Sequence, residues 1–245
     1  MERSYNKNQT LYFYKYKGIL YISIIMVNAM YNIGLKYQTD KITHHEYHQI
    51  YDFFLKSLYN KEGSILEIGI DGGKSLKMWL ELFPNAYIYG MDIRLNYSGD
   101  RYNIFKGDQS KEGDLNIIKN TLKDKGLFFI NDDGSHIPEH QILTFNTLFP
   151  LLSEGGIYII EDIETSYWTK NGLYGYETRY GYKHPNSIVE IFKEVADSVN
   201  SEFIKNISTK VQHCEQIGSI TFSRNCIIMV KKLAKQRLYR FSGNL

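Results

Sequence analysis

Five short apolar runs, separated by segments with helical spacing, constrain the fold of this chain more than any other feature. Each run has the length of a buried strand, and several intervening segments place apolar side chains on one helical face. The predicted strands are 64–70, 86–92, 102–108, 127–132 and 157–162. Strands that alternate with helices predict an α/β fold with a doubly wound, mostly parallel, Rossmann-like sheet.

Helices and a hairpin are predicted around these strands. The clearest helix, 138–152, has a proline at its start, and another is expected near 186–198. Apolar runs at 219–222 and 226–230 predict a C-terminal antiparallel hairpin. A further helix is predicted from Thr39 onward. Its apolar face is expected to contain Tyr47, Ile50, Tyr51, Phe54 and Leu55.

Length and charge limit the domain organisation and the partners. A chain of 245 residues is long enough for one sizeable domain, which we expect to span 31–245. The apolar stretch 19–27 imitates a signal peptide and is too short to span a bilayer. Residues 1–30 are expected to be a dispensable or miscalled leader, with Met26 and Met30 as candidate starts of translation. The net charge of +2 and the scattered lysines favour a small-molecule ligand over nucleic acid. A homo-oligomer is compatible with the sequence.

The two cysteines indicate a compartment. Cys214 and Cys226 lack the spacing of metal ligands, and Cys226 lies in an apolar run. Both are predicted to be reduced and structural, which points to a cytoplasmic protein.

A glycine-rich loop follows the first predicted strand, in the segment Glu67-Ile68-Gly69-Ile70-Asp71-Gly72-Gly73-Lys74-Ser75. Glycines there let the backbone approach a ligand, and Asp92, about 20 residues further on, stands where a carboxylate usually accepts hydrogen bonds from ribose. The spacing fits neither a dinucleotide-binding loop nor a phosphate-binding loop, since Ile68 stands where the latter needs glycine. S-adenosylmethionine, a nucleoside cofactor without phosphate, fits best. A nucleotide phosphate site and a purely structural turn are the alternatives.

Acidic residues end the last two predicted strands, in Asp132-Asp133-Gly134-Ser135-His136 and in Glu161-Asp162. Because the carboxyl ends of parallel strands meet at one edge of a sheet, these side chains are expected to share a site. Carboxylates suit a hard divalent cation such as Mg²⁺, and an imidazole can move a proton. Adjacent carboxylates usually point apart, so Asp132 is expected to support the site. Capping and loop solvation are the alternative explanation.

These motifs also carry a resemblance. The stretch from about Lys36 to Trp168 resembles the metal-dependent sugar O-methyltransferases related to the mycinamicin and demethylmacrocin enzymes. The matching strings are Leu66-Glu67-Ile68-Gly69, Ser75-Leu76-Lys77-Met78-Trp79, Tyr89-Gly90-Met91-Asp92, Gly107-Asp108-Gln109-Ser110, Asp132-Asp133-Gly134-Ser135-His136, Glu139-His140-Gln141, Glu161-Asp162 and Thr165-Ser166-Tyr167-Trp168. Two strings depart from the family: Gly73-Lys74-Ser75-Leu76 replaces Gly-Gly-Ser-Leu, and Gln38-Thr39-Asp40-Lys41 replaces Gly-Thr-Asp-Lys.

The resemblance implies a class I methyltransferase fold, S-adenosylmethionine and magnesium. It implies that Asp133, Glu161 and Asp162 are metal ligands and that His136 is the general base, so that Asp133 and His136 form the catalytic pair. It also implies that Asp92 and Asp108 hold the ribose and adenine regions. The full set of predicted cofactor-binding residues is Glu67, Gly69, Gly73, Ser75, Asp92, Asp108, Gln109 and Asp132.

The expected function is Mg²⁺-dependent methyl transfer to a sugar hydroxyl of a small carbohydrate or nucleotide-sugar precursor, for capsule, lipopolysaccharide or a glycosylated metabolite. Aromatic residues could stack on the sugar as a lid, namely Tyr167, Trp168 and the tyrosines at 174, 176, 180 and 182. His44, His45 and His48 are expected to mark a helix start, although His45 or Tyr47 could contact the cofactor. The alternatives are a catechol-type O-methyltransferase, a nucleotide phosphate-binding enzyme and a catalytically silent ligand-binding protein.

Overall fold

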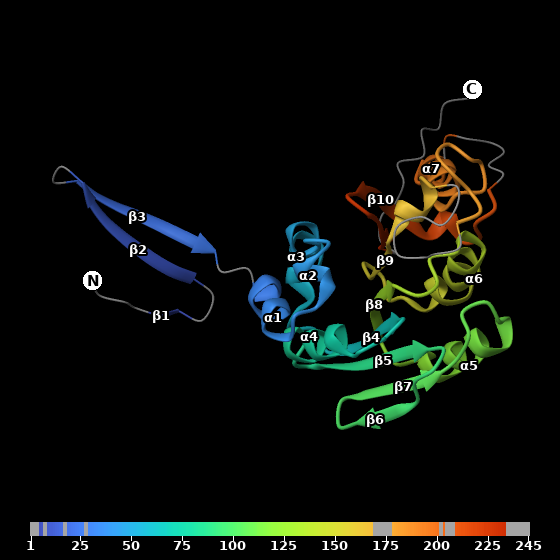
Figure 1. The fold of residues 1–245 in the computed structure, drawn as a ribbon, viewed down its shortest axis with the longest axis horizontal. Helices are drawn as coiled ribbons and strands as arrows, with labels where there is room; N and C mark the ends of the chain where they lie inside the picture. The colour runs from blue at the N-terminus through green and yellow to red at the C-terminus, as the bar shows by residue number, and fades with distance from the viewer. Residues whose placement is uncertain are drawn as a thin grey trace.

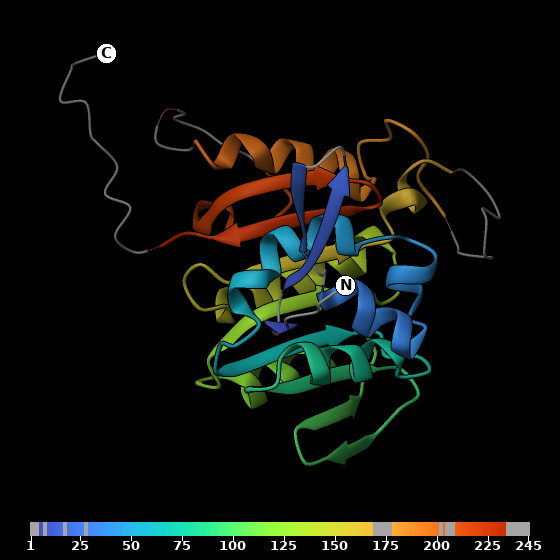
Figure 2. The same cartoon turned by 90° about the vertical axis from the view of Figure 1, so that its left-hand side faces the viewer.

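The structure is a computed structural model that describes residues 5–6, 9–16, 19–26, 29–168, 178–200, 203 and 209–233 (Figure 1). Its main element is an eight-stranded sheet in the order β10-β11-β9-β8-β4-β5-β7-β6. The strands are β4 (Gly63–Ile68), β5 (Ala86–Asp92), β6 (Tyr97–Gly99), β7 (Tyr102–Lys106), β8 (Leu127–Asp132), β9 (Ile157–Glu161), β10 (Ile217–Ser223) and β11 (Cys226–Lys231). In Figure 2 the sheet runs from the red C-terminal strands at the top to the green β6–β7 pair at the bottom.

The pairing of the strands confirms the predicted fold class. The five predicted strands β4, β5, β7, β8 and β9 pair in parallel, and β10 and β11 add the antiparallel C-terminal hairpin. The chain builds outward from β4 to β5 and β7, then returns to the other side of β4 with β8 and β9. Strand order therefore reverses between β4 and β8, where a doubly wound sheet opens a crevice for ligands.

Helices cover both faces of the sheet. They are α1 (Ala29–Tyr37), α2 (Asp40–Thr43), α3 (His48–Leu55), α4 (Lys74–Leu82), α5 (Glu112–Leu122), α6 (Pro138–Leu148) and α7 (Ile188–Ser198). Apolar side chains of α1 to α4 pack in one cluster with Ile159, and those of α5 to α7 pack in a second cluster with Ile160. Neighbouring residues of β9 thus face opposite layers, as the period of a strand requires. Figure 1 shows these layers to the left and right of the strands.

The helix predicted after Thr39 corresponds to α3, which begins at His48, and a separate short helix, α2, precedes it. The structure has α2 and then α3, separated by a turn in which Glu46 has a φ of 56°. A residue in this left-handed conformation cannot continue a right-handed helix. Within the predicted apolar face, Tyr47, Tyr51 and Leu55 are buried. The turn brings α2 close to the strand ends.

The first described residues form a second, separate sheet. Strands β1 (Tyr5–Asn6), β2 (Gln9–Tyr16) and β3 (Ile19–Met26) pair in antiparallel fashion, and β3 contains most of the apolar stretch 19–27. The division of the chain near residue 30 stays a prediction. No helix in the described part of the chain is long and apolar enough to cross a membrane.

Candidate active site

A cavity of about 590 Å³ opens at the carboxyl ends of β4, β5 and β8, at the reversal of strand order. Eight of the predicted site residues line it: Gly69, Ser75, Asp92, Asp108, Gln109, Asp133, His136 and Asp162. Residues of the segment that contains α2 also line it, namely Gln38, Asp40 and Thr43. The predicted residues Glu67, Gly73, Asp132 and Glu161 do not. The structure therefore separates the predicted set into eight residues that line the cavity and four that do not.

Gly69 holds two strand ends together. Its φ is +85°, and a Cβ at this position would lie 2.0 Å from the backbone oxygen of Asp133. The Asp133 amide in turn donates to the carbonyl of Ile68 over 2.9 Å. Glycine is required here both for the left-handed backbone and for the close approach of the two chains.

We expect Gly69→Ala to lower the free energy of unfolding by more than about 2 kcal/mol, because the left-handed strain adds to a backbone clash. Ligand binding in the cavity should weaken as well, since Asp133 must move. Gly72→Ala is the matched control, because a Cβ at Gly72 has nothing within 4 Å. Urea unfolding of both variants measures the difference. Equal stability of Gly69→Ala and the wild type would contradict the steric role.

Asp92 organises the loops around the cavity. Its carboxylate accepts hydrogen bonds from the backbone amides of Ile70, Asp71, Arg94 and Leu95, at 2.8–3.1 Å. Burial alone would raise the pKa of Asp92, but these four bonds lower it. Four donors match the number of lone-pair sites on a carboxylate. The predicted contact of Asp92 with ribose stays a prediction.

Asp108 and Gln109 follow β7 at the cavity wall. Asp108 accepts from the hydroxyl of Ser110 at 2.7 Å. The side-chain amide of Gln109 donates to Asp132 at 2.6 Å and accepts from the backbone of Ser135 at 2.9 Å. Gln109 thereby ties the end of β7 to the loop after β8.

Two predicted cofactor residues point away from the cavity. Glu67 is fully buried and accepts hydrogen bonds from the Ser75 hydroxyl at 2.8 Å and the Trp79 indole at 2.9 Å, so it faces α4. Asp132 is also fully buried and bonds to Gln109 and Tyr158. Asp132 does not line the cavity, and its supporting role stays a prediction.

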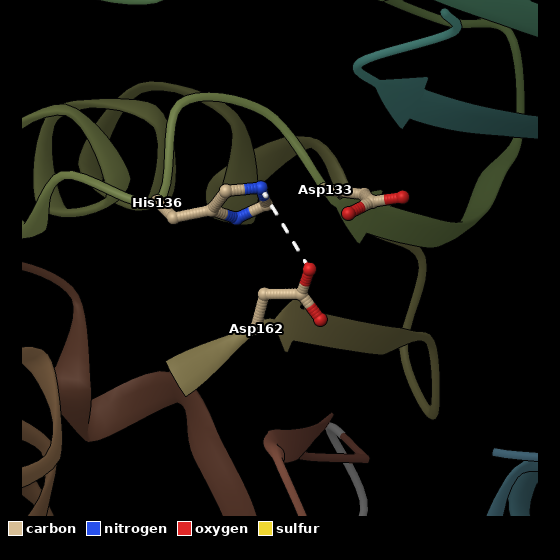
Figure 3. Close-up of side chains that lie close together, drawn as sticks. All are labelled: Asp133, His136 and Asp162. Carbon is tan, nitrogen blue, oxygen red and sulfur yellow. Dashed lines mark ion pairs between the residues drawn. The ribbon is translucent and has the colours of Figure 1, made fainter. Parts of the chain in front are cut away.

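Asp133, His136 and Asp162, which all line the cavity, lie close together (Figure 3). One potential ligand atom from each lies within 4.8 Å of the others, and His136 Nε2 is 3.8 Å from Asp162 Oδ2. His136 and Asp162 have φ values of 55° and 53°. Such strained conformations cluster at functional sites. Burial lowers the pKa of His136, so its imidazole is neutral at neutral pH.

Glu161, the third predicted metal ligand, lies behind this group. It is 1% exposed and accepts hydrogen bonds from the Lys41 ammonium at 2.7 Å and the Tyr51 hydroxyl at 2.8 Å. Asp133 reaches the same ammonium at 2.6 Å. Burial raises the pKa of Glu161, and Lys41 opposes that rise.

Several residues of the site were not predicted as parts of it. Lys41 and Tyr51 contact the carboxylates, and Asn225 donates to Asp162 at 3.0 Å. Tyr47, considered as a cofactor contact, donates to Asp162 at 2.8 Å. The available signal was the string Thr39-Asp40-Lys41, which matches the family outside the strand ends.

No family model matches the chain. Among curated proteins, it is 28% identical over 218 residues to the 8-demethyl-8-alpha-L-rhamnosyl tetracenomycin-C 2'-O-methyltransferase of Streptomyces olivaceus, covering 84% of this chain and 55% of the relative. It is 34% identical over 181 residues to the L-olivosyl-oleandolide 3-O-methyltransferase of Streptomyces antibioticus, covering 69% and 45%. It is 38% identical over 128 residues to the mycinamicin VI 2''-O-methyltransferase of Micromonospora griseorubida, covering 48% and 31%.

Among solved structures, the MycE methyltransferase of the mycinamycin biosynthetic pathway, in complex with Mg and SAH, superimposes with a TM-score of 0.72 at 25% identity. The match covers 85% of this chain and 55% of that chain. The fold is therefore that of a class I methyltransferase. The relatives are sugar O-methyltransferases, which confirms the resemblance seen in the motifs, and the chain spans about half the length of the curated relatives it matches.

Proposed function

We propose that this protein is an S-adenosylmethionine-dependent O-methyltransferase that uses a divalent cation such as Mg²⁺ to methylate a sugar hydroxyl. The observation that carries the proposal is the meeting of the glycine-lined cavity with Asp133, His136 and Asp162 at the reversal of strand order. The MycE complex with Mg and SAH supports both ligands. Two buried free thiols support the cytoplasm as the compartment.

The residues at the cavity fit a nucleoside donor. A volume of about 590 Å³ lies within the usual range of small-molecule sites. Gly69 and Gly72 line the cavity without side chains, and Asp92 and Asp108 line it with carboxylates. Acidic residues disfavour a phosphate there, which weakens the nucleotide phosphate alternative.

The donor set of the acidic group fits a hard cation. Asp133 and Asp162 offer carboxylate oxygens, and no cysteine belongs to the group. The Glu161 carboxylate would bind the same cation only if its side chain rotated away from the Lys41 ammonium, which lies 2.7 Å from it. When bound, the cation would acidify an acceptor hydroxyl and the donor would supply a sulfonium methyl group.

His136 is the proposed base. Its neutral imidazole can accept the proton of the acceptor hydroxyl, while the oxygen forms a bond to the methyl carbon and the carbon–sulfur bond breaks, leaving a neutral thioether. Asp162, 3.8 Å from Nε2, stabilises the imidazolium that results. Asn225 and Tyr47 hold Asp162 in place by hydrogen bonds.

The proposed acceptor is a sugar with two neighbouring hydroxyls, which together can fill open positions on the cation. The names of the relatives support a glycosylated metabolite more than a capsule or lipopolysaccharide precursor. Tyr167 and Tyr182 stack with ring centroids 6.1 Å apart and are 47% and 65% exposed, so they offer flat faces to a sugar. The predicted lid residues 174 and 176 lie outside the described residues.

Donor binding is the first test. We expect calorimetry to show binding of S-adenosylmethionine and of its demethylated product, because the acidic cavity lining suits a nucleoside that carries no phosphate. ATP should give no heat. Clear binding of ATP with none of the methyl donor would support the nucleotide phosphate alternative instead.

A screen with a labelled methyl donor tests the acceptor. We expect transfer to glycosides or nucleotide sugars that carry vicinal hydroxyls, and less to analogues with one hydroxyl removed. Catechols and RNA belong in the same screen. Transfer to catechols alone would replace the sugar assignment by a catechol one and leave the fold and the donor unaffected.

A further inference from the structure

Lys41 is a buried cation at the junction of three strands. Its side chain is 1% exposed, and its ammonium lies 2.6 Å from Asp133 Oδ2, 2.7 Å from Glu161 Oε2 and 3.5 Å from Glu67 Oε1. The three carboxylates belong to the end of β4, the end of β8 and the end of β9. No other part of the described chain brings a lysine to these carboxylates.

Without this ammonium, folding would have to bring three poorly hydrated carboxylates together with no compensating positive charge, which would destabilise the folded state. Glu67 and Glu161 are at most 2% exposed, and Asp133 is 22% exposed, so water screens their mutual repulsion poorly. The ammonium lies 2.6 Å from Asp133 Oδ2 and 2.7 Å from Glu161 Oε2, which are the distances of charge-assisted hydrogen bonds. Lys41 therefore offsets part of the carboxylate charge.

The same ammonium connects the two halves of the site. Glu67 accepts hydrogen bonds from the Ser75 hydroxyl and the Trp79 indole, so it anchors the first turns of α4 after the glycine loop. Asp133 belongs to the group at the cavity. Lys41 thus links the wall proposed for the donor to the group proposed for the cation.

We propose that Lys41 is the resident cation of this centre, a positioning residue whose ammonium holds Asp133 and Glu161 side by side and allows the carboxylate cluster to fold before any divalent cation binds. Only the Mg²⁺ readout described below rests on the proposed function. The charge compensation itself rests on the contacts of Lys41.

The test is thermal unfolding of Lys41→Met in excess chelator and in millimolar Mg²⁺. Breaking a buried ion pair is strongly destabilising and should lower the Tm of a chain of this size by about 6–20 °C. We expect that loss in chelator, and we expect Mg²⁺ to recover much of it by supplying positive charge. The wild type also binds the cation under the proposed function, so its Tm should rise in Mg²⁺ as well, but by less than that of Lys41→Met.

A charge-compensated double variant separates this role from ordinary packing. Lys41→Met combined with Glu161→Gln removes one charge of each sign, so in chelator it should be more stable than Lys41→Met alone. A packing defect would only be deepened by the second change. Lys36→Met is the control lysine, because Lys36 pairs with Glu81 at the surface, and its Tm should stay within about 1 °C of the wild type.

The outcomes are distinguishable. If Lys41→Met does not fold, a folded double variant supports the proposal and an unfolded one overturns it. A wild-type Tm for Lys41→Met in chelator, or a double variant no more stable than the single one, also overturns it. If the double variant is more stable than Lys41→Met but Mg²⁺ stabilises none of the proteins, the role of Lys41 is supported. That result would count against the cation in the proposed function.

Discussion

Excess chelator should abolish methyl transfer, and Asp133→Asn or Asp162→Asn should raise the Mg²⁺ concentration required by about 100-fold or more. Even residues that only support metal ligands typically change metal affinity about 10–100-fold. Asp133 and Asp162 lie at the cavity with His136, so each amide removes a charged oxygen that faces the proposed cation. Donor binding should persist in chelator, since Gly69 and Asp92, which line the cavity, are not among the proposed cation ligands.

The measurement is a cation titration of activity, with direct binding followed by calorimetry or by the resonance of Mn²⁺. Asp132→Asn is the control, because its carboxylate bonds to Gln109 and Tyr158 and does not line the cavity. Glu161→Gln discriminates further: a steep rise in the requirement identifies it as a ligand, and a small one leaves it as a partner of Lys41. Undiminished turnover in chelator would remove the cation from the mechanism.

The central strands were predictable because their signal is local. Strands β5 and β8 begin and end at the predicted residues, since each is a run of buried apolar residues closed by an aspartate. Strand β4 ends two residues earlier than predicted, because Gly69 takes a left-handed conformation that no sequence pattern specifies. The parallel direction of the central strands followed from βα alternation, whereas their order in the sheet was not predicted.

The orientation of individual carboxylates was not predictable in the same way. Glu67 directly precedes the glycine loop, yet it faces α4, because the Trp79 indole and the Ser75 hydroxyl lie on that side of β4. Lys41 reaches Asp133 and Glu161 across 92 and 120 residues of sequence. These long-range contacts depend on how α2 and the turn after it pack against the strand ends. The spacing of apolar residues in the sequence does not specify that packing. Adjacent side chains such as Asp132 and Asp133 separate by the alternation of a strand, and that part was predictable.

His136→Ala should reduce the rate of methyl transfer by about 10²–10⁴-fold, the range typical of a lost general base, while donor and cation still bind. A base acts mainly in the transition state, so kcat should fall and KM should change little. His136 lies 3.8 Å from Asp162 and lines the cavity, so it can reach a hydroxyl held beside Asp162. Single-turnover kinetics with calorimetric checks of both ligands measures the effect.

His140→Ala is the matched control, because its ring bonds to the Ser135 hydroxyl at 2.9 Å and it does not line the cavity. The rate of methyl transfer by His140→Ala should stay within a few fold of the wild-type rate, because His140 does not face the reacting atoms.

The pH dependence of the rate is a further test of His136. The base must be neutral to accept a proton, and burial lowers the pKa of His136. The wild-type rate should therefore be flat near neutral pH and fall only as the pH drops below that lowered pKa. His136→Ala should lose this acid limb together with the rate. Wild-type turnover in His136→Ala would instead assign the proton to solvent, and the left-handed backbone at residue 136 would then have to serve the shape of the loop alone.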